Sequence, residues 1–204
     1  DKITLKNSKI NLTKTKSSNI VELNGFMKTN NEFDNFNLKQ IYDSNKKSFN
    51  IVGKADLTNS VVNIAKLNYI KDDGKKSEID FNFNFIPKKY INITKFFFQS
   101  DKTIIDIEQL KLNKNFEKED FKKLKIKTFT NGSKNNDFLV KKSNKVNISG
   151  NIFDAEPLLK SLFKKDDRKT FSKKFNSKVK INFDKTITGT NDDVTNFSMI
   201  ASIN

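Results

Sequence analysis

Apolar and polar residues alternate with a period of two along most of the chain, as they do in β-strands that bury one face. In the segment EIDFNFNFIP (78–87) the apolar positions are Ile79, Phe81, Phe83 and Phe85, and the polar positions are Asp80, Asn82 and Asn84. The segment SKVKINFDKTI (177–187) repeats this, with Val179, Ile181 and Phe183 alternating with Lys178, Lys180 and Asn182. We therefore expect strands with one apolar and one polar face.

The same alternation predicts further strands, separated by short turn-forming clusters. The segment KITLKNSKINLT (2–13) alternates, slips at Asn7-Ser8 and resumes, which predicts a bulge or a tight turn. The other predicted strands cover residues 20–27, 36–42, 48–57, 61–67, 90–99, 103–112, 124–129, 137–141, 145–153 and 196–203. Between strands lie the turn clusters KDDGKK (71–76), TNGSKNN (130–136) and GTNDD (189–193). Short turns between successive strands favour antiparallel meanders over β-α-β units.

Two all-β architectures would bury such a set of apolar strand faces. One is an elongated, curled antiparallel sheet that wraps around its own apolar side as an open groove, and the other is a β-sandwich of two stacked sheets. Alternation alone does not distinguish them. Gly25, Gly53 and Gly150 each lie inside a predicted strand, where glycine marks a bulge, a bend or a close backbone approach. These positions fit a sheet that bends at recurrent points.

One segment departs from the alternation and predicts a short helix over residues 155–163. Asp154 is a good N-cap, and Pro157 falls in the first turn, where its missing N–H is not needed. The apolar residues that share one face of this helix are Leu158, Leu159, Leu162 and Phe163. We expect this helix to cap an open end or edge of the sheet, since an exposed edge promotes aggregation. The alternative is a mobile lid over a ligand groove.

The charge of the chain raises the question of nucleic-acid binding, because the formal net charge is +15. However, Arg168 is the only arginine among the 39 basic residues. Phosphate and base recognition favour the planar fork of arginine, and the lysines are scattered along the chain instead of forming one stripe. We therefore expect no nucleic-acid partner.

The chain contains no cysteine and no histidine. Disulfides and thiol chemistry are thereby excluded, and the commonest general base and transition-metal ligand are missing. The carboxylate-rich stretches KDDG, FEKED and NDD have the composition of turns. We expect no metal site, no cofactor and no catalytic residues, and hence a protein that is not an enzyme.

The sequence has no apolar run as long as a membrane span and no signal-peptide pattern. It begins with Asp1, and a strand is predicted to start at Ile3. We expect residues 1–204 to be a single β-rich segment of a longer chain.

Two segments resemble AsmA-like proteins of the YhdP type. Residues 55–83 (ADLTNSVVNIAKLNYIKDDGKKSEIDFNF) are similar to a segment of that family. The family segment reads Asp-Leu-Thr, then an apolar strand, and then Lys, acidic or small residues and Gly. Residues 146–163 (VNISGNIFDAEPLLKSLF) resemble its Gly-x-x-Phe-Asp-Ala-x-Pro-Leu-Leu element, at a similar spacing. KTFTNGSKNNDFLV (127–140) lies where the family has its hairpin. The resemblance covers most of the chain; the asparagine and lysine content and the absence of tryptophan depart from the family.

The resemblance implies a periplasmic protein of diderm bacteria, anchored in the inner membrane by an N-terminal helix that this segment lacks. It implies a long curled sheet whose apolar groove carries phospholipid towards the outer membrane, with acyl chains and flanking β-segments of the same chain as partners. The candidate groove-lining residues are Phe81, Phe83, Phe85, Ile91, Ile93, Val179, Ile181 and Phe183. In the alternative hypothesis, the same residues form the closed core of a structural or adhesive β-domain.

Overall fold

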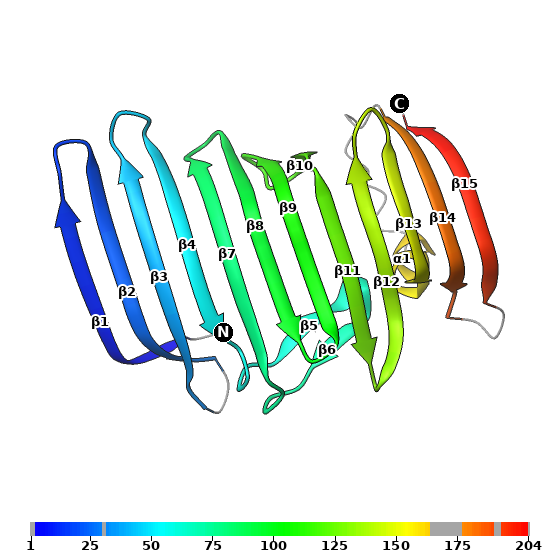
Figure 1. Cartoon of the computed structure of the whole chain (residues 1–204), viewed down its shortest axis with the longest axis horizontal. Helices are drawn as coiled ribbons and strands as arrows, with labels where there is room; N and C mark the ends of the chain where they lie inside the picture. The colour runs from blue at the N-terminus through cyan, green and yellow to red at the C-terminus, as the bar shows by residue number, and fades with distance from the viewer. Residues whose placement is uncertain (1–2, 30–31, 164–176, 190–192, 204) are drawn as a thin grey trace.

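The computed structural model describes residues 3–29, 32–163, 177–189 and 193–203, and these form a long sheet with a few short additions (Figure 1). The strands are β1 (Thr4–Lys14), β2 (Ser18–Lys28), β3 (Asp34–Asp43), β4 (Ser48–Asp56), β5 (Val62–Ile64), β6 (Tyr69–Lys71), β7 (Ser77–Ile86), β8 (Tyr90–Ser100), β9 (Thr103–Asn113), β10 (Lys118–Asp120), β11 (Lys123–Thr130), β12 (Ser133–Lys142), β13 (Val146–Asp154), β14 (Ser177–Ile187) and β15 (Val194–Ile203). The helices are the 3-10 helix η1 (Ala65–Leu67) and α1 (Glu156–Phe163).

The large sheet has 13 strands, and its order follows the chain: β1-β2-β3-β4-β7-β8-β9-β11-β12-β13-β14-β15, with β10 beside β9. Its strands pair antiparallel, except that β13 and β14 run parallel. The prediction of an all-β fold built on a curled sheet is confirmed. The expected all-antiparallel meander needs one correction, because parallel neighbours require a crossover connection and α1 lies in that crossover.

Some predicted boundaries were wrong in the connection between β4 and β7. The strand predicted over residues 61–67 is divided into β5 and η1, and β6 was missed. Asn68 has the left-handed conformation, φ 49°, so the chain turns there and β6 pairs back on β5 as a separate two-stranded sheet. β10 was also missed, because a three-residue strand is too short to display an alternating pattern.

The slip predicted at Asn7-Ser8 is a β-bulge. The register between β1 and β2 shifts between Lys6 and Lys9, and Asn7 has a φ of 49°. Gly25 lies across from the bulge, where an added Cβ would come 2.7 Å from the Cα of Ser8. Gly150 similarly lies at the shift between β12 and β13. These glycines accommodate irregular strand pairing, as expected.

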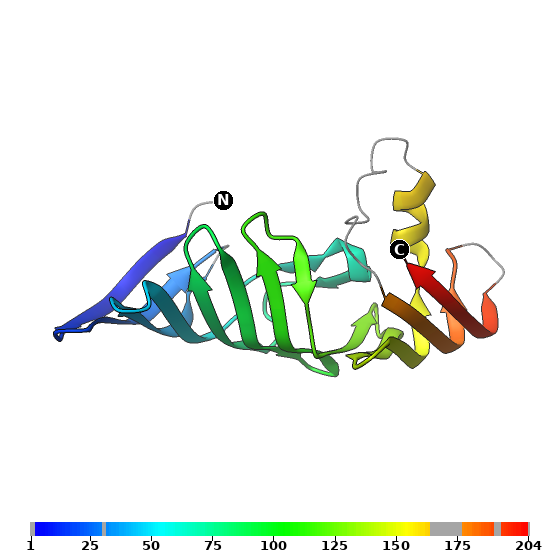
Figure 2. The ribbon, with the colours of Figure 1, turned by 90° about the horizontal axis from the view of Figure 1, so that it is seen from above.

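The strand register aligns the apolar faces of all neighbouring strands. Directly paired residues lie on the same face of a sheet. One unbroken row of such pairs comprises Leu12, Val21, Gln40, Ile51 and Phe83, and another comprises Phe81, Phe96, Ile107, Leu124, Val140, Ile148, Ile181 and Met199. Figure 2 shows that the sheet curls, and that β5, β6 and α1 lie on its concave side. The concave face is therefore the apolar one.

Two clusters of buried residues lie on this concave face. In the first, Tyr69 of β6 packs on Phe98, Ile105 and Ile126. In the second, Phe121, Val146 and Val179 pack together. The facing sheet in the first cluster has only two strands of three residues each. The described residues are therefore not a β-sandwich, and the alternative architecture is wrong.

The predicted helix is present, but its position differs from the prediction. The sheet ends at β1 and β15, whereas α1 connects β13 to β14 and contacts η1. It therefore does not cover a sheet edge. The Asp154 carboxylate accepts the Glu156 backbone N–H at 3.1 Å. The first hydrogen bond of the helix, however, runs from the Leu159 N–H to the Ala155 carbonyl, so Ala155 and not Asp154 is the N-cap residue.

The helix face that was expected to be buried is largely open. Leu158 and Leu162 are 46% and 55% exposed, whereas Leu159 and Pro157 are half-buried. The side chain of Phe163 lies outside the described residues. The alternative in which α1 is a mobile lid over a ligand groove stays a prediction, because its apolar face is exposed on the concave side of the sheet.

Candidate apolar groove

The structure places all eight predicted lining residues on the concave face. Ile91 and Ile93 of β8 pair with Phe85 and Phe83 of β7, and Ile181 continues the same face on β14. Phe81, Phe83, Phe85, Ile91, Ile93 and Ile181 are half-buried. Six of the eight side chains therefore retain part of their surface in the groove.

The other two predicted residues are buried by protein. Val179 is 5% exposed and packs with Phe121 and Val146. Phe183 is 4% exposed, and its ring lies 5.0 Å from that of Phe153. Both side chains contribute to the interior packing under β13 and β14.

Aromatic rings line the half of the groove formed by β3, β4 and β7. The Phe49 ring lies between Tyr42 and Phe85, with both centroid distances at 4.7 Å. The Phe81 and Phe83 rings stack at 4.8 Å. Tyr42 and Phe49 were not among the predicted lining residues, although both lie in strands whose alternation was recognised. Cross-strand pairing, which the sequence does not display, brings them beside Phe85.

A hairpin covers part of the groove. We call β5, η1 and β6 the covering hairpin. Its residues Val62, Ile64, Leu67 and Tyr69 pack over the apolar side chains of β8, β9, β11 and β12. The sheet is therefore double-layered at this point, and the space there is filled by protein.

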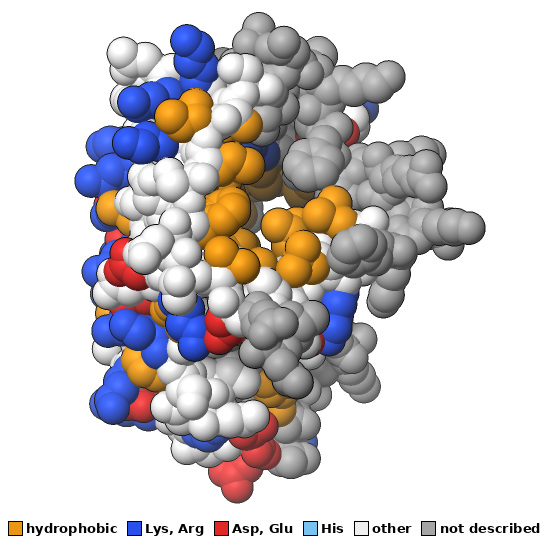
Figure 3. Space-filling view, turned by 90° about the vertical axis from the view of Figure 1, so that its right-hand side faces the viewer, with side chains coloured by type: hydrophobic (Ala, Val, Ile, Leu, Met, Phe, Trp, Pro, Cys, Tyr) orange, Lys and Arg blue, Asp and Glu red, His pale blue; other side chains and the backbone are white. Residues whose placement is uncertain are grey.

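The N-terminal part of the concave face is open. On β1, Leu5, Ile10 and Leu12 are 50%, 61% and 76% exposed, although their partners on β2 continue the apolar face. At the opposite end of the sheet, Met199 of β15 is 40% exposed. Figure 3, which views that end, shows hydrophobic side chains gathered around a hollow. The groove is thus a partly covered apolar channel.

The convex face is mainly polar, and several of its side chains pair with one another. The Asn50 amide donates to Asn82 and to Asn84, both at 2.8 Å. Ion pairs on the same face join Lys95 to Asp80 at 2.6 Å, and Lys123 to Glu108. Phe26, Val52 and Ile200 are also exposed on this face. The two faces of the sheet therefore differ in balance: the convex face carries these polar pairs, and the concave face is mainly apolar.

A buried lysine holds the covering hairpin in place. Lys71 of β6 is 1% exposed, and its ammonium donates to the carbonyl oxygens of Leu57, Thr58 and Ser60 at 2.6–3.0 Å. Burial lowers the pKa of Lys71, an effect opposed by the nearby Asp34 carboxylate. Because all three ammonium protons have acceptors, this lysine is an anchor for the hairpin.

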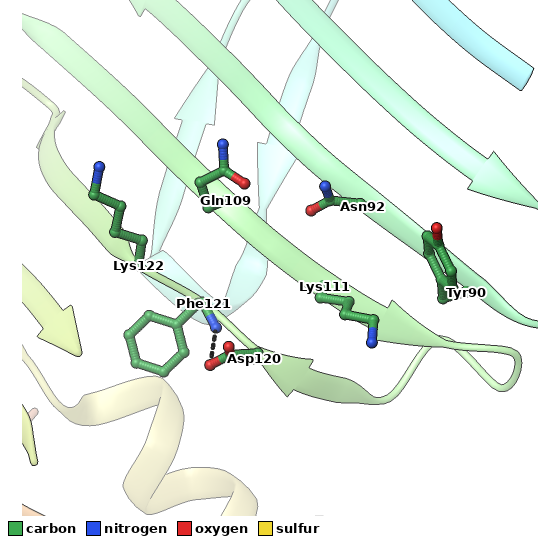
Figure 4. A pocket seen from close by; sticks show the side chains of 7 residues that line it. All are labelled: Tyr90, Asn92, Gln109, Lys111, Asp120, Phe121 and Lys122. Carbon is green, nitrogen blue, oxygen red and sulfur yellow. Dashed lines mark hydrogen bonds between the residues drawn. The ribbon is translucent and has the colours of Figure 1, made fainter. Parts of the chain in front are cut away.

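A polar recess lies outside the groove (Figure 4). Its lining residues are Tyr90, Asn92, Gln109, Lys111, Asp120, Phe121 and Lys122. Lys111 and Asn92 are directly paired, and Asn92 pairs with Asn84 of the convex face. The Lys111 ammonium lies 5.1 Å from the centre of the Tyr90 ring. Its charged side chains are two lysines and one carboxylate, Lys111, Lys122 and Asp120, and we assign the recess no chemistry.

The described ranges contain neither a metal-binding cluster nor a membrane-spanning helix. Among those residues, no group of three or more acidic side chains is arranged to hold a metal ion. In the same ranges, no helix has the length and apolarity needed to cross a membrane. Comparison of the chain with protein-family models, with curated proteins and with solved structures finds no match.

Proposed function

We propose that this chain conveys phospholipid by holding acyl chains in the concave apolar groove. In this proposal it is a periplasmic segment of a longer protein, anchored in the inner membrane, that moves lipid towards the outer membrane. The flanking β-segments of that protein would pair with the edge strands β1 and β15 and extend the groove. The chain acts as a conduit and carries out no chemical reaction.

One observation supports this proposal. Neighbouring strands of the large sheet share one apolar face, the concave face, and the covering hairpin covers only part of it. An acyl chain in such a groove gains about 0.8 kcal/mol for each buried CH₂ group. Burial of this kind is non-directional, since it depends on area and not on fixed contacts. A lipid can therefore move along the groove without breaking specific bonds.

Lipid extraction tests the proposal directly. The chain is purified under mild conditions, extracted with organic solvent, and analysed by mass spectrometry. We expect phospholipid to co-purify with the protein in stoichiometric rather than trace amounts. A lipid-free preparation that also fails to take up phospholipid from vesicles would contradict the groove and favour a structural β-domain.

A further inference from the structure

The turns at one margin of the sheet carry an excess of lysine. Hairpin turns alternate between the two margins of an antiparallel sheet, and Figure 1 shows five of them along its upper side: β1–β2, β3–β4, β7–β8, β9–β10 and β12–β13. We call these turns the upper margin. Their charged residues are Lys16, Lys46, Lys47, Lys88, Lys89, Lys114, Glu117 and Lys145, all exposed. Seven of these eight residues are cationic.

These lysines are largely free of carboxylate partners. The exception is Lys46, whose ammonium nitrogen lies 3.6 Å from a carboxylate oxygen of Asp43. In the described part of the chain, the other six make no ion pair within 4.0 Å. By contrast, lysines on the convex face such as Lys39 and Lys95 are paired with Glu22 and Asp80. Unpaired lysines such as Lys9, Lys125 and Lys178 are also exposed on the convex face. The upper margin is therefore distinguished by turns that carry almost no acidic residues, and not by holding all of the unpaired charge.

The opposite margin has no such excess. In its described connections the acidic residues are Glu32, Asp72, Asp73, Asp101 and Asp193, and the basic residues are Lys66, Lys75, Lys76 and Lys102. The two signs are nearly balanced there. In Figure 3, Lys and Arg side chains follow the left side of the molecule from top to bottom, and acidic side chains occupy its lowest point.

The lysine-bearing turns follow the groove along its length. Successive turns at one margin are separated by two strands, or about 10 Å. The concave face lies between the two margins, so a lipid with its acyl chains in the groove places its head group at a margin. An anionic head group is attracted by the upper margin and gains nothing at the lower one.

We infer that the groove selects lipids with a net negative head group and holds them with that head group at the upper margin. This inference rests on the proposed function, because it requires acyl chains in the groove. It specifies the class of lipid: anionic phospholipid, in preference to a zwitterionic one with the same acyl chains.

A competition experiment tests the inference. The full chain is incubated with vesicles of equimolar phosphatidylglycerol and phosphatidylcholine with identical acyl chains, separated from them, and its bound lipid is quantified by mass spectrometry. We expect about a fivefold preference for phosphatidylglycerol at low salt, the effect of one lysine near an anionic lipid. The preference declines in about 1 M NaCl, where the Debye length is about 3 Å.

Two matched variants locate the effect. The test variant replaces Lys46, Lys47, Lys88 and Lys89 with Gln, and the control variant replaces Lys66, Lys75, Lys76 and Lys102 with Gln. Both remove the same charge from exposed positions, and each set includes one ion-paired lysine. The test variant should lose the preference while binding the same total lipid, and the control variant should keep it.

The possible outcomes separate this inference from the proposed function. Uptake of both lipids without preference overturns the inference but not the proposed function, and so does an equal loss of preference in both variants. Uptake of neither lipid overturns both. Inorganic phosphate at millimolar concentration should not displace bound phosphatidylglycerol, since acyl-chain burial holds it; displacement would show a simple anion site and overturn the inference.

Discussion

The ring of Phe81 lies directly over Gly53 on the neighbouring strand. A Cβ added at Gly53 would come within 2.9 Å of two ring carbons, Cε1 and Cε2. Gly53 is buried, and its glycine identity lets the aromatic ring lie flat on the backbone of β4. This contact sets the position of the Phe81 ring in the groove.

Replacing Gly53 with Ala should therefore destabilise the protein by about 1–3 kcal/mol through overpacking. The measurement is urea unfolding of the wild type and the variant. The Phe81→Leu background is the control: the smaller side chain makes room for the methyl group, so the same substitution should cost less there. Equal costs in the two backgrounds would show that the ring is not the cause.

Phe83→Asp should impair lipid uptake far more than Asn82→Asp. The Phe83 side chain lies on the concave face, and a carboxylate there would be buried against acyl chains. Asn82 lies on the convex face, and Asp at that position keeps the oxygen that accepts from Asn50. The measurement is uptake of fluorescent phospholipid from vesicles, with unfolding curves beside it, because Phe83→Asp also lowers stability. Equal uptake by two folded variants would contradict the facial assignment.

Asn136→Ala should destabilise the protein by about 2–4 kcal/mol. The Asn136 amide is fully buried and donates to Leu67 O at 2.9 Å and to Thr128 Oγ1 at 3.0 Å. Its oxygen accepts the Asp154 backbone N–H at 3.0 Å. It thus joins the covering hairpin, β11 and the end of β13. Chemical denaturation measures the cost, and a loss below about 0.5 kcal/mol would show that water replaces these bonds.

Acid should weaken the pairing between β9 and β11. The Lys123 ammonium donates to Glu108, and this hydrogen bond lowers the pKa of Glu108 below its ordinary value of 4.5. A carboxylate with a lowered pKa in the folded state stabilises the fold above the unfolded-state pKa, and that contribution is lost as the pH falls through the folded-state pKa. The affected range therefore lies below 4.5.

The variant Glu108→Gln isolates this contribution. It cannot titrate, so it should lose less stability than the wild type when unfolding is compared at pH of about 6 and about 3. Identical pH dependence in the two proteins would show that the pair is screened by solvent.

The alternation of apolar and polar residues was sufficient to predict the long strands, because a two-residue period has one structural meaning. The bulge at Asn7 was visible for the same reason: one extra residue interrupts the period. The lining residues of β7 and β8 could be assigned to one face from their own segments. Face assignment is a local property, and the sequence displays local properties directly.

Features that depend on partners distant in the sequence were not predictable. The parallel pairing of β13 with β14 depends on where the chain returns after α1. Burial of Val179 depends on Phe121, which lies in the connection between β10 and β11 and belongs to no alternating pattern. Likewise, nothing around Lys71 distinguishes it in sequence from the many exposed lysines. In each case the deciding contact joins two segments whose register a single sequence does not reveal.

The strand order of the large sheet follows the order of the chain, so most strands depend on the two beside them. Linear repeat proteins share this property, and their stability is a sum of neighbouring terms. Amide protons of β8 and β9, beneath the covering hairpin, should exchange slowly, whereas those of β1 and β15 exchange fast. Such a ribbon frays at its ends while its middle persists, and can therefore accept additional strands without any rearrangement of its centre.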